Sequence, residues 1–291
     1  MDISTFQSNL DFIKSLYSNK EWKDEDCKND ILEAVEECNE MLMNAFGKSL
    51  QRLWDHKSSA EAVEKVVRKF PSTLSYVDED YREIPIVHAA GYEGFEYIPV
   101  LAQEGIKHKV GGEDARGGLL TIDSGRRNTL QILGYYGNDH AMKVNVFQEL
   151  RELGLLQKND IQEYKLLEWT CVSRSRDRFE YLVSWDPDAL IETRVYNQPL
   201  IHYMVDEDEQ HSSMHLLLKA GFEYHPKIGG ILFVEDDEGM TGLDYMCEQK
   251  GVDAVISLLQ QILSPSCDFP ILHHVFIKEP KHIKLFTEKF P

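Results

Sequence analysis

Two histidines one helical turn apart form the first candidate for chemistry in this sequence. His211 and His215 stand at positions i and i+4, so a helix would place both imidazoles on one face, where they could bind a metal ion. Asp208 and Glu209 lie just before them, but Ser212 replaces the glutamate of an H-E-x-x-H zinc site. The pair is therefore a weak metal candidate beside the simpler interpretation of a solvent-facing helix start, and we expect no metal, cofactor or catalytic residue.

A glycine-rich segment and a basic run are the next candidates, both for binding phosphate. Residues 111–118 read G-G-E-D-A-R-G-G, which lacks the G-K-[ST] ending of a phosphate-binding loop and carries two acids that repel phosphate, so we expect a flexible insertion. Residues 173–178 read S-R-S-R-D-R. The three alternating arginines suit a phosphate or an acidic peptide, whereas a solvated turn between two helices is the commoner role of such a run.

Acidic runs outnumber basic ones. They stand at residues 24–26, 78–80, 206–209 and 235–238. Clustered carboxylates steer a basic partner toward a protein surface, and they also simply solvate turns. The sequence supports these two roles about equally.

An internal repeat indicates the elements that must position these residues. The pattern P-[IL]-[VIL]-H occurs at Pro85–His88, Pro199–His202 and Pro270–His273, and poorer copies begin at 128, 165 and 241. A proline at the first helical position loses no hydrogen bond and already has the helical φ angle. We therefore expect a helix to begin at each of the six starts, with His88, His202 and His273 packed inward.

A longer period divides the chain into two blocks. Pro71 and Pro187 are 116 residues apart, and so are Gly105 and Gly221. Each block contains three starts of the shorter repeat. We therefore expect two three-unit blocks, 58–176 and 177–291, preceded by a segment 1–57 that lacks the repeat.

Each unit is expected to hold two short helices. The second helix should end at Gly105 in the first block and at Gly221 in the second, because the position after a helix favours positive φ. Leu101 and Leu217 precede these glycines by four residues and should be buried between helices.

The repeat resembles the ankyrin-repeat family. Residues 85–94 read P-I-V-H-A-A-G-Y-E-G, close to the family signature T-P-L-H-x-A-A, although the proline stands one place early and other units lack the second small residue. Lead-ins of the form F-P-x-x-L and Gly-Gly insertions resemble the diverged ankyrin-like proteins of diatoms, over about residues 60 to 291. This resemblance implies an all-α solenoid of helix pairs with long turn or hairpin insertions, acting as an interaction scaffold without catalysis.

In ankyrin-like arrays the turns before the helix pairs project along one edge as a row of fingers. On this resemblance, the candidate partner-binding residues lie in such turns or beside them. They are Asp78, Glu79, Asp80, Tyr81, Tyr196, Glu235, Asp236, Asp237 and Glu238.

The two ends of the chain carry separate expectations. Apolar residues between 31 and 53 recur at steps of three and four, which predicts a helical cap over the first unit. A coiled coil is the alternative, and with it an assembly protein that self-associates through 24–57, so the oligomeric state stays open. The last unit, 270–291, ends without a successor, so we expect Leu285, Phe286 and Phe290 to form an exposed apolar face.

Composition narrows the class of partner. The chain has 291 residues with 31 Lys and Arg against 50 Asp and Glu, a net charge of −19, which disfavours nucleic acid and anionic membrane as partners. Five cysteines without a C-x-x-C pair favour reduced thiols, and the start lacks a signal peptide, so we expect an intracellular protein of cytoplasm or nucleus.

A scaffold for a basic protein partner is the leading function, and a metal enzyme using His211 and His215 is the alternative.

Overall fold

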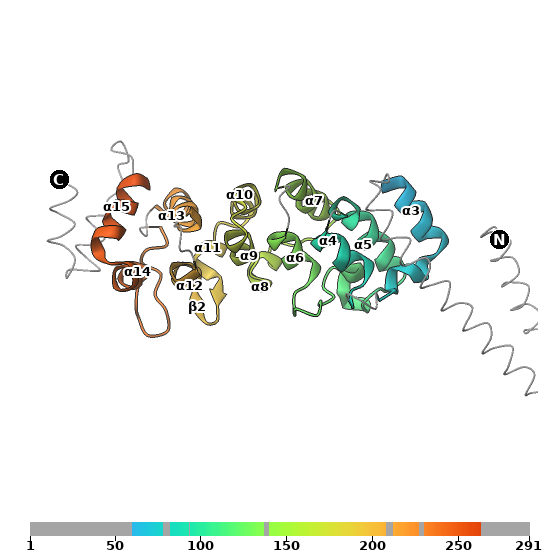
Figure 1. The fold of residues 1–291 in the computed structure, drawn as a ribbon, viewed down its shortest axis with the longest axis horizontal. Coiled ribbons are helices and arrows are strands. Elements are labelled where there is room, and N and C mark those ends of the chain that lie inside the picture. The colour runs from blue at the N-terminus through green and yellow to red at the C-terminus, as the bar shows by residue number, and fades with distance from the viewer. Residues whose placement is uncertain are drawn as a thin grey trace, which may run out of the picture.

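The computed structural model describes residues 60–77, 82–92, 94–136, 140–207, 212–226 and 230–262. This part of the chain is mostly helical, with one two-stranded sheet. Figure 1 shows the helices following one another in chain order along an elongated body. The all-α class is therefore confirmed at this level. The segment 1–57, the unit beginning at Pro270 and the apolar face expected on 270–291 lie outside the described residues.

Five helices begin at the starts expected from the short repeat, each within one residue. We call them the first row: α4 (Pro85–Gly91), α6 (Thr129–Tyr135), α9 (Leu166–Val172), α12 (Leu200–Glu207) and α14 (Gly242–Lys250). Pro85 occupies the first turn of α4 as expected. Pro199 differs slightly, because it ends a short strand and α12 begins at the next residue. Contacts run from each of these helices to the next, from α4 to α14.

The helices between them form a second row. Its members are α3 (Ala60–Lys69), α5 (Ile98–Lys107), α7 (His140–Glu152), α10 (Arg176–Trp185), α13 (Ser212–Tyr224) and α15 (Val252–Ile262). Each of them contacts the next member of the row. The chain thus alternates between two parallel rows of helices. An amphipathic helix in such a stack buries its apolar stripe against its neighbours.

Short elements connect the two rows. They are η1 (Pro71–Ser75), η2 (Phe95–Tyr97), η3 (Glu113–Gly118), α8 (Asp160–Glu163), α11 (Ala189–Glu192), β1 (Arg194–Val195) and β2 (Gln198–Pro199). The two strands form an antiparallel hairpin in which Arg194 pairs with Pro199 and Val195 pairs with Gln198. Leu74 of the F-P-x-x-L lead-in is buried, and so is Leu190, which follows Pro187 at the same spacing.

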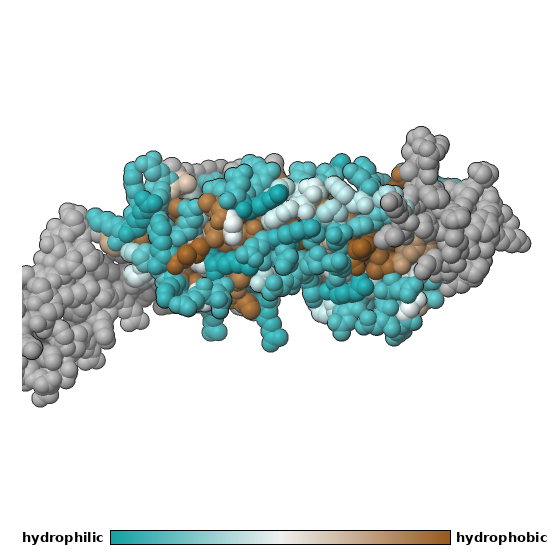
Figure 2. Space-filling view, turned by 180° about the vertical axis from the view of Figure 1, so that it is seen from behind, coloured by the Kyte–Doolittle hydropathy of each residue, from teal (hydrophilic) through white to brown (hydrophobic). Residues whose placement is uncertain are grey.

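A single apolar core runs through both rows. Leu101 and Leu217 are fully buried in it, which confirms their expected placement. Figure 2 shows a largely hydrophilic face on which apolar side chains gather toward the two ends of the described part. The buried apolar residues form one cluster that extends from Val63 in α3 to Leu259 in α15.

Gly105 and Gly221 have a different role from the expected one. Both lie inside helices, α5 and α13, and neither has positive φ, so the prediction that they end these helices is wrong. A Cβ on Gly105 would lie only 2.3 Å from the Gly117 carbonyl oxygen, and a Cβ on Gly221 would lie 3.1 Å from Ile231. The glycines are needed because the Gly-Gly insertions pack directly on these helices. The glycine-rich segment 111–118, expected as a flexible insertion, accordingly contains η3 (Glu113–Gly118), which packs against α5.

Polar side chains near the start of second-row helices bind carbonyls at the ends of first-row helices. The buried Lys143 ammonium of α7 donates to the Ala90 carbonyl of α4 at 3.2 Å and to the Tyr136 carbonyl at 2.6 Å. The buried Arg178 guanidinium of α10 donates to the Leu133 carbonyl of α6. The Ser213 hydroxyl of α13 donates to the Cys171 carbonyl of α9 at 2.7 Å.

These bonds share a physical purpose. The last carbonyls of a helix have no intrahelical donor and carry the negative end of the helix dipole. A cation or hydroxyl from a neighbouring helix satisfies them in the dry interior. The bonds to Ala90, Leu133 and Cys171 also tie a second-row helix to the first-row helix of the preceding unit, so they help to fix the stacking of successive units.

Candidate functional site

Three tight turns lie along one edge of the molecule, each immediately before a first-row helix (Figure 1). We call them the edge turns: 122–128, 194–199 and 235–241. Each is closed by antiparallel pairing, Ile122 with Asn128, β1 with β2, and Glu235 with Thr241. The residue that closes each turn is also the residue before the helix. The helix start therefore fixes the position of the turn.

Aspartates hold two of the edge turns from inside. Asp123 accepts a hydrogen bond from the Arg127 backbone N–H at 2.7 Å, and Asp236 accepts one from the Met240 backbone N–H at 2.8 Å. Asp236 also accepts one from the Glu238 backbone N–H. Aspartate suits this role because its short carboxylate can bond the backbone of its own turn. Asp236, a candidate for partner binding, is thus largely engaged in holding its own turn.

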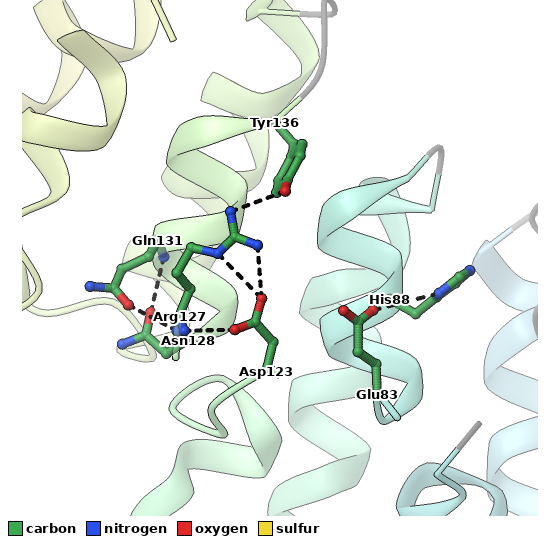
Figure 3. A network of polar contacts seen from close by, with 7 residues as sticks. All are labelled: Glu83, His88, Asp123, Arg127, Asn128, Gln131 and Tyr136. Carbon is green, nitrogen blue, oxygen red and sulfur yellow. Dashed lines mark hydrogen bonds and ion pairs between the residues drawn. The ribbon is translucent and has the colours of Figure 1, made fainter. Parts of the chain in front are cut away.

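Side-chain bonds anchor the first edge turn to α6 (Figure 3). The Arg127 guanidinium donates to Asp123 at 3.1 Å and to the Tyr136 hydroxyl at 3.0 Å. Asn128 caps α6 by accepting from the Gln131 backbone N–H at 2.9 Å, and the Gln131 side chain accepts from the Asn128 N–H. This reciprocal pair is a capping box, which satisfies two otherwise unpaired helix donors. The turn is therefore a rigid support for what it displays.

The edge turns display exposed side chains of different chemistry. Ile122 is 65% exposed and Tyr196 is 80% exposed. In the third turn Glu235, Asp237 and Glu238 are exposed. The structure thus places Tyr196 and these acids along the same edge. Asp78, Glu79, Asp80 and Tyr81 lie outside the described residues.

The two described repeat histidines each stack on an aromatic ring and lie near a carboxylate. His202 of α12 is fully buried, stacks on Tyr245 of α14 with ring centroids 4.7 Å apart, and holds its Nδ1 3.5 Å from Asp236 Oδ2. His88 stacks on Tyr92 at 4.3 Å, with its Nδ1 3.7 Å from a Glu83 carboxylate oxygen (Figure 3). His202 therefore links its own helix both to the next first-row helix and to the third edge turn.

The stability of the protein is expected to fall in mild acid because of His202. Burial lowers the pKa of His202, while Asp236 opposes this shift. The unfolded chain then binds a proton near the ordinary histidine pKa of about 6.5, at which the folded chain does not. Stability from this group is present above about pH 6.5 and is lost as pH falls below it.

Urea unfolding at a series of pH values checks this expectation. His202→Gln should flatten the decline in unfolding free energy below about pH 6.5, whatever its effect on stability at neutral pH. The slope is the measured quantity, because a buried glutamine also changes packing. An unchanged slope in the variant would assign the acid sensitivity to other groups.

The histidine pair 211 and 215 does not come together as a described metal site. His211 lies outside the described residues, whereas His215 lies half-buried on α13 beside Arg174, Arg176 and Lys219. Cations at this position oppose the approach of a divalent metal ion. Within the described ranges, no group of three or more His, Cys, Asp or Glu is arranged to hold a metal.

The basic run 173–178 divides into surface and interior. Arg174 and Arg176 are exposed, but Arg178 is fully buried and donates to helix-end carbonyls. Sequence spacing cannot distinguish these roles, because alternate residues at the start of a helix point in different directions. The surface arginines instead meet Lys219 and His215 from α13, a grouping that is not evident from the linear sequence.

Comparison with known proteins adds no relative to this picture: the chain matches no protein-family model and no curated protein. Among the described helices, none combines the length and the hydrophobicity that spanning a bilayer requires.

Proposed function

We propose that the chain is an ankyrin-like solenoid that serves as a non-catalytic protein-interaction scaffold. On this proposal the edge turns act as fingers and bind a basic segment or surface of a partner protein. The observation that carries the proposal is the recurrence of a turn closed by antiparallel pairing before a first-row helix, with different exposed side chains each time. Repeat scaffolds with this property present a long surface whose chemistry can vary from unit to unit.

Corresponding positions of the edge turns support this reasoning. Ile122, Arg194 and Glu235 each pair with the residue just before a first-row helix, and all three are exposed. One is apolar, one is basic and one is acidic. The backbone of these turns is held by the turn aspartates, by the helix cap at Asn128 and by the β1–β2 pair. The side chains at the three positions can therefore differ in chemistry without loss of the fold. A surface that only needed to be soluble would not require such rigid support.

The expected chemistry of binding follows from the exposed side chains of the edge turns. Glu235, Asp237 and Glu238 present three carboxylates in one turn, and the net charge of −19 adds a long-range attraction for a cation. Tyr196 supplies a large, well-supported aromatic contact, since its ring lies 6.1 Å from that of Tyr203 and 5.7 Å from the Lys165 ammonium. A segment with Lys or Arg near an apolar side chain fits this edge.

A salt-dependent pull-down with a matched pair of variants tests the proposed function. The edge variant is Glu235→Gln with Asp237→Asn and Glu238→Gln. The control removes the same charge from exposed second-row positions, as Glu61→Gln with Glu149→Gln and Glu152→Gln. We expect wild type and control to retain basic partners at low salt and to release them at high salt. The edge variant should bind about tenfold more weakly, since it loses three rim charges.

The contradicting outcomes are specific. Partners that are acidic, or that stay bound at high salt, would remove the electrostatic argument. Equal retention by the edge variant and the control would show that binding occurs elsewhere on the chain. Absence of any partner under both salt conditions would remove the scaffold function itself.

A further inference from the structure

Two adjoining hollows lie between α10 and α13 in the second row. Their volumes are about 320 and 230 Å³, and they share the lining residues Glu180, Leu216 and Lys219. Together they form one groove along the two helices, which we call the α10–α13 groove. Contact between α10 and α13 is sparser than between α10 and its other neighbours, α7 and α9, which leaves room for the groove. Each hollow is large enough to take a side chain or two of a bound peptide.

One end of the groove is basic. Arg174, Arg176 and Lys219 line it together with His215, and Glu180 is the single carboxylate among the residues that line this end. Arg176 is 66% exposed and its guanidinium contacts the Glu180 carboxylate at 2.8 Å. Glu223 lines the adjoining hollow, so the groove as a whole holds three cations against two carboxylates, a small positive excess that lies at this end. In a chain with a net charge of −19, such a local excess favours an anionic ligand in this groove.

The other end of the groove is mostly apolar. Leu216, Ala220 and Tyr224 of α13 line it, and Phe179 and Val183 of α10 lie behind them. The polar residues of its lining are Glu180, Ser184, Lys219 and Glu223. Tyr224 is 38% exposed, whereas Phe179 and Val183 are fully buried. An apolar hollow with an adjacent cluster of cations is a common design for binding a peptide, because the apolar part supplies affinity and the charges fix direction.

We propose that the α10–α13 groove binds a short acidic segment of a partner protein, with carboxylates at the Arg174–Lys219 end and an apolar side chain beside Leu216 and Tyr224. Aspartate and glutamate fit better than a phosphorylated residue. Glu180 stands within the cation cluster, and its charge repels a phosphate dianion more strongly than a single carboxylate.

A second copy of this chain is a poorer occupant than a separate protein. Each copy carries a charge of −19, and two such bodies repel each other when they approach. The groove also lies in the second row of helices, whereas the edge turns precede first-row helices. The inference therefore does not depend on the proposed function of the edge turns, and the two surfaces suit partners of opposite charge.

Selection of a displayed random peptide library on the full chain tests the groove directly. The groove variant is Arg176→Glu with Lys219→Glu. The control is Lys65→Glu with Lys109→Glu, which are exposed cations far from the groove, and each of them, like Arg176, pairs with a glutamate of its own segment. All four positions are exposed, so both variants should fold. Enriched peptides, synthesised with a fluorescent label, are then measured by anisotropy.

The expected result has three parts. Enriched peptides should contain Asp or Glu next to a large apolar residue. They should bind wild type and control alike but the groove variant at least about tenfold more weakly. Replacing their acids by lysine should restore binding to the groove variant, as expected when charges are exchanged across an interface.

The opposite results would overturn the inference. Enrichment of peptides without acids, equal binding to the groove variant, or no enrichment at all would each show that the groove does not recognise an acidic segment. Light scattering decides the remaining case. If the chain is dimeric and the groove variant is monomeric, the groove is occupied by a second copy and the proposed partner peptide is wrong.

Discussion

Replacement of Arg178 by alanine should lower the free energy of unfolding by about 3–5 kcal/mol, a loss typical of breaking a buried polar network. The Arg178 side chain is fully buried. Its guanidinium donates to the Leu133 carbonyl, to the Ser175 hydroxyl at 2.6 Å and to the Tyr136 carbonyl at 3.2 Å. Burial lowers the pKa of Arg178 to about 10, which still leaves it charged at neutral pH.

The alanine variant loses three kinds of stabilisation at once. The Leu133 carbonyl loses a charged donor, and hydrogen bonds to charged groups contribute about 1.5–3 kcal/mol each. The negative end of α6 loses a cation. A large side chain is replaced by a small one, which leaves a cavity between α6, α9 and α10. Relief from the desolvation of the charge offsets part of this loss, so the total stays within about 5 kcal/mol.

Arg176 supplies a matched control two residues away in the same helix. Its side chain is 66% exposed and pairs only with Glu180 in the described part of the chain. Arg176→Ala should change the unfolding free energy by less than about 0.5 kcal/mol, because exposed ion pairs contribute little. Chemical denaturation measures both variants. If Arg178→Ala costs less than about 1 kcal/mol, the helix-end bonds do not hold the rows together.

The difference between these two arginines shows where sequence reasoning stops. The helix starts at 85, 128, 165, 199 and 241 are predictable because proline, turn residues and apolar spacing act within a few residues of the chain. The burial of Arg178 depends instead on the end of α6, which lies 42 residues away at Tyr136. No local pattern contains that contact.

The candidate site shows the same division. Tyr196 and the acids of residues 235–238 could be placed in turns from the sequence, since turn chemistry is local. The inward role of Asp236 depends on the closure of its own turn, and a regular acidic run gives no sign of it. The α10–α13 groove joins residues 174–184 to residues 213–224, so only the stacking of the two helices reveals it.

The recurrence of glycine at positions 105 and 221 marks these positions in the sequence. The physical reason why position 105 requires glycine is that the insertion around Gly117 packs directly on it. A Cβ at Gly105 would lie 2.3 Å from the Gly117 carbonyl oxygen, and a Cβ at Gly117 would lie 2.0 Å from the Ala102 carbonyl oxygen. Both contacts are with backbone, which cannot rotate away. Either the insertion or α5 must therefore shift to admit a methyl group.

Gly105→Ala should accordingly lower the unfolding free energy by about 3 kcal/mol, the upper part of the usual range for overpacking. Gly117→Ala should cost at least as much, because Gly117 also has a φ of 68°, where an added Cβ is strained. Gly221→Ala should cost only about 1 kcal/mol. Its nearest neighbours are Ile231 atoms at 3.1 Å, and two of these three belong to a side chain that can adjust.

Gly91→Ala completes the series as a control at the end of α4. Its added Cβ would meet only Ile132 Cγ2 at 3.8 Å, an ordinary contact, and its φ is not positive. Alanine has a higher helix propensity than glycine, so the unfolding free energy of this variant should rise by up to about 1 kcal/mol. The expected order of stability is therefore Gly91→Ala, wild type, Gly221→Ala and then Gly105→Ala, measured by thermal or urea unfolding. A Gly105→Ala protein as stable as wild type would mean that the insertion does not pack on α5, because no other feature of position 105 requires glycine.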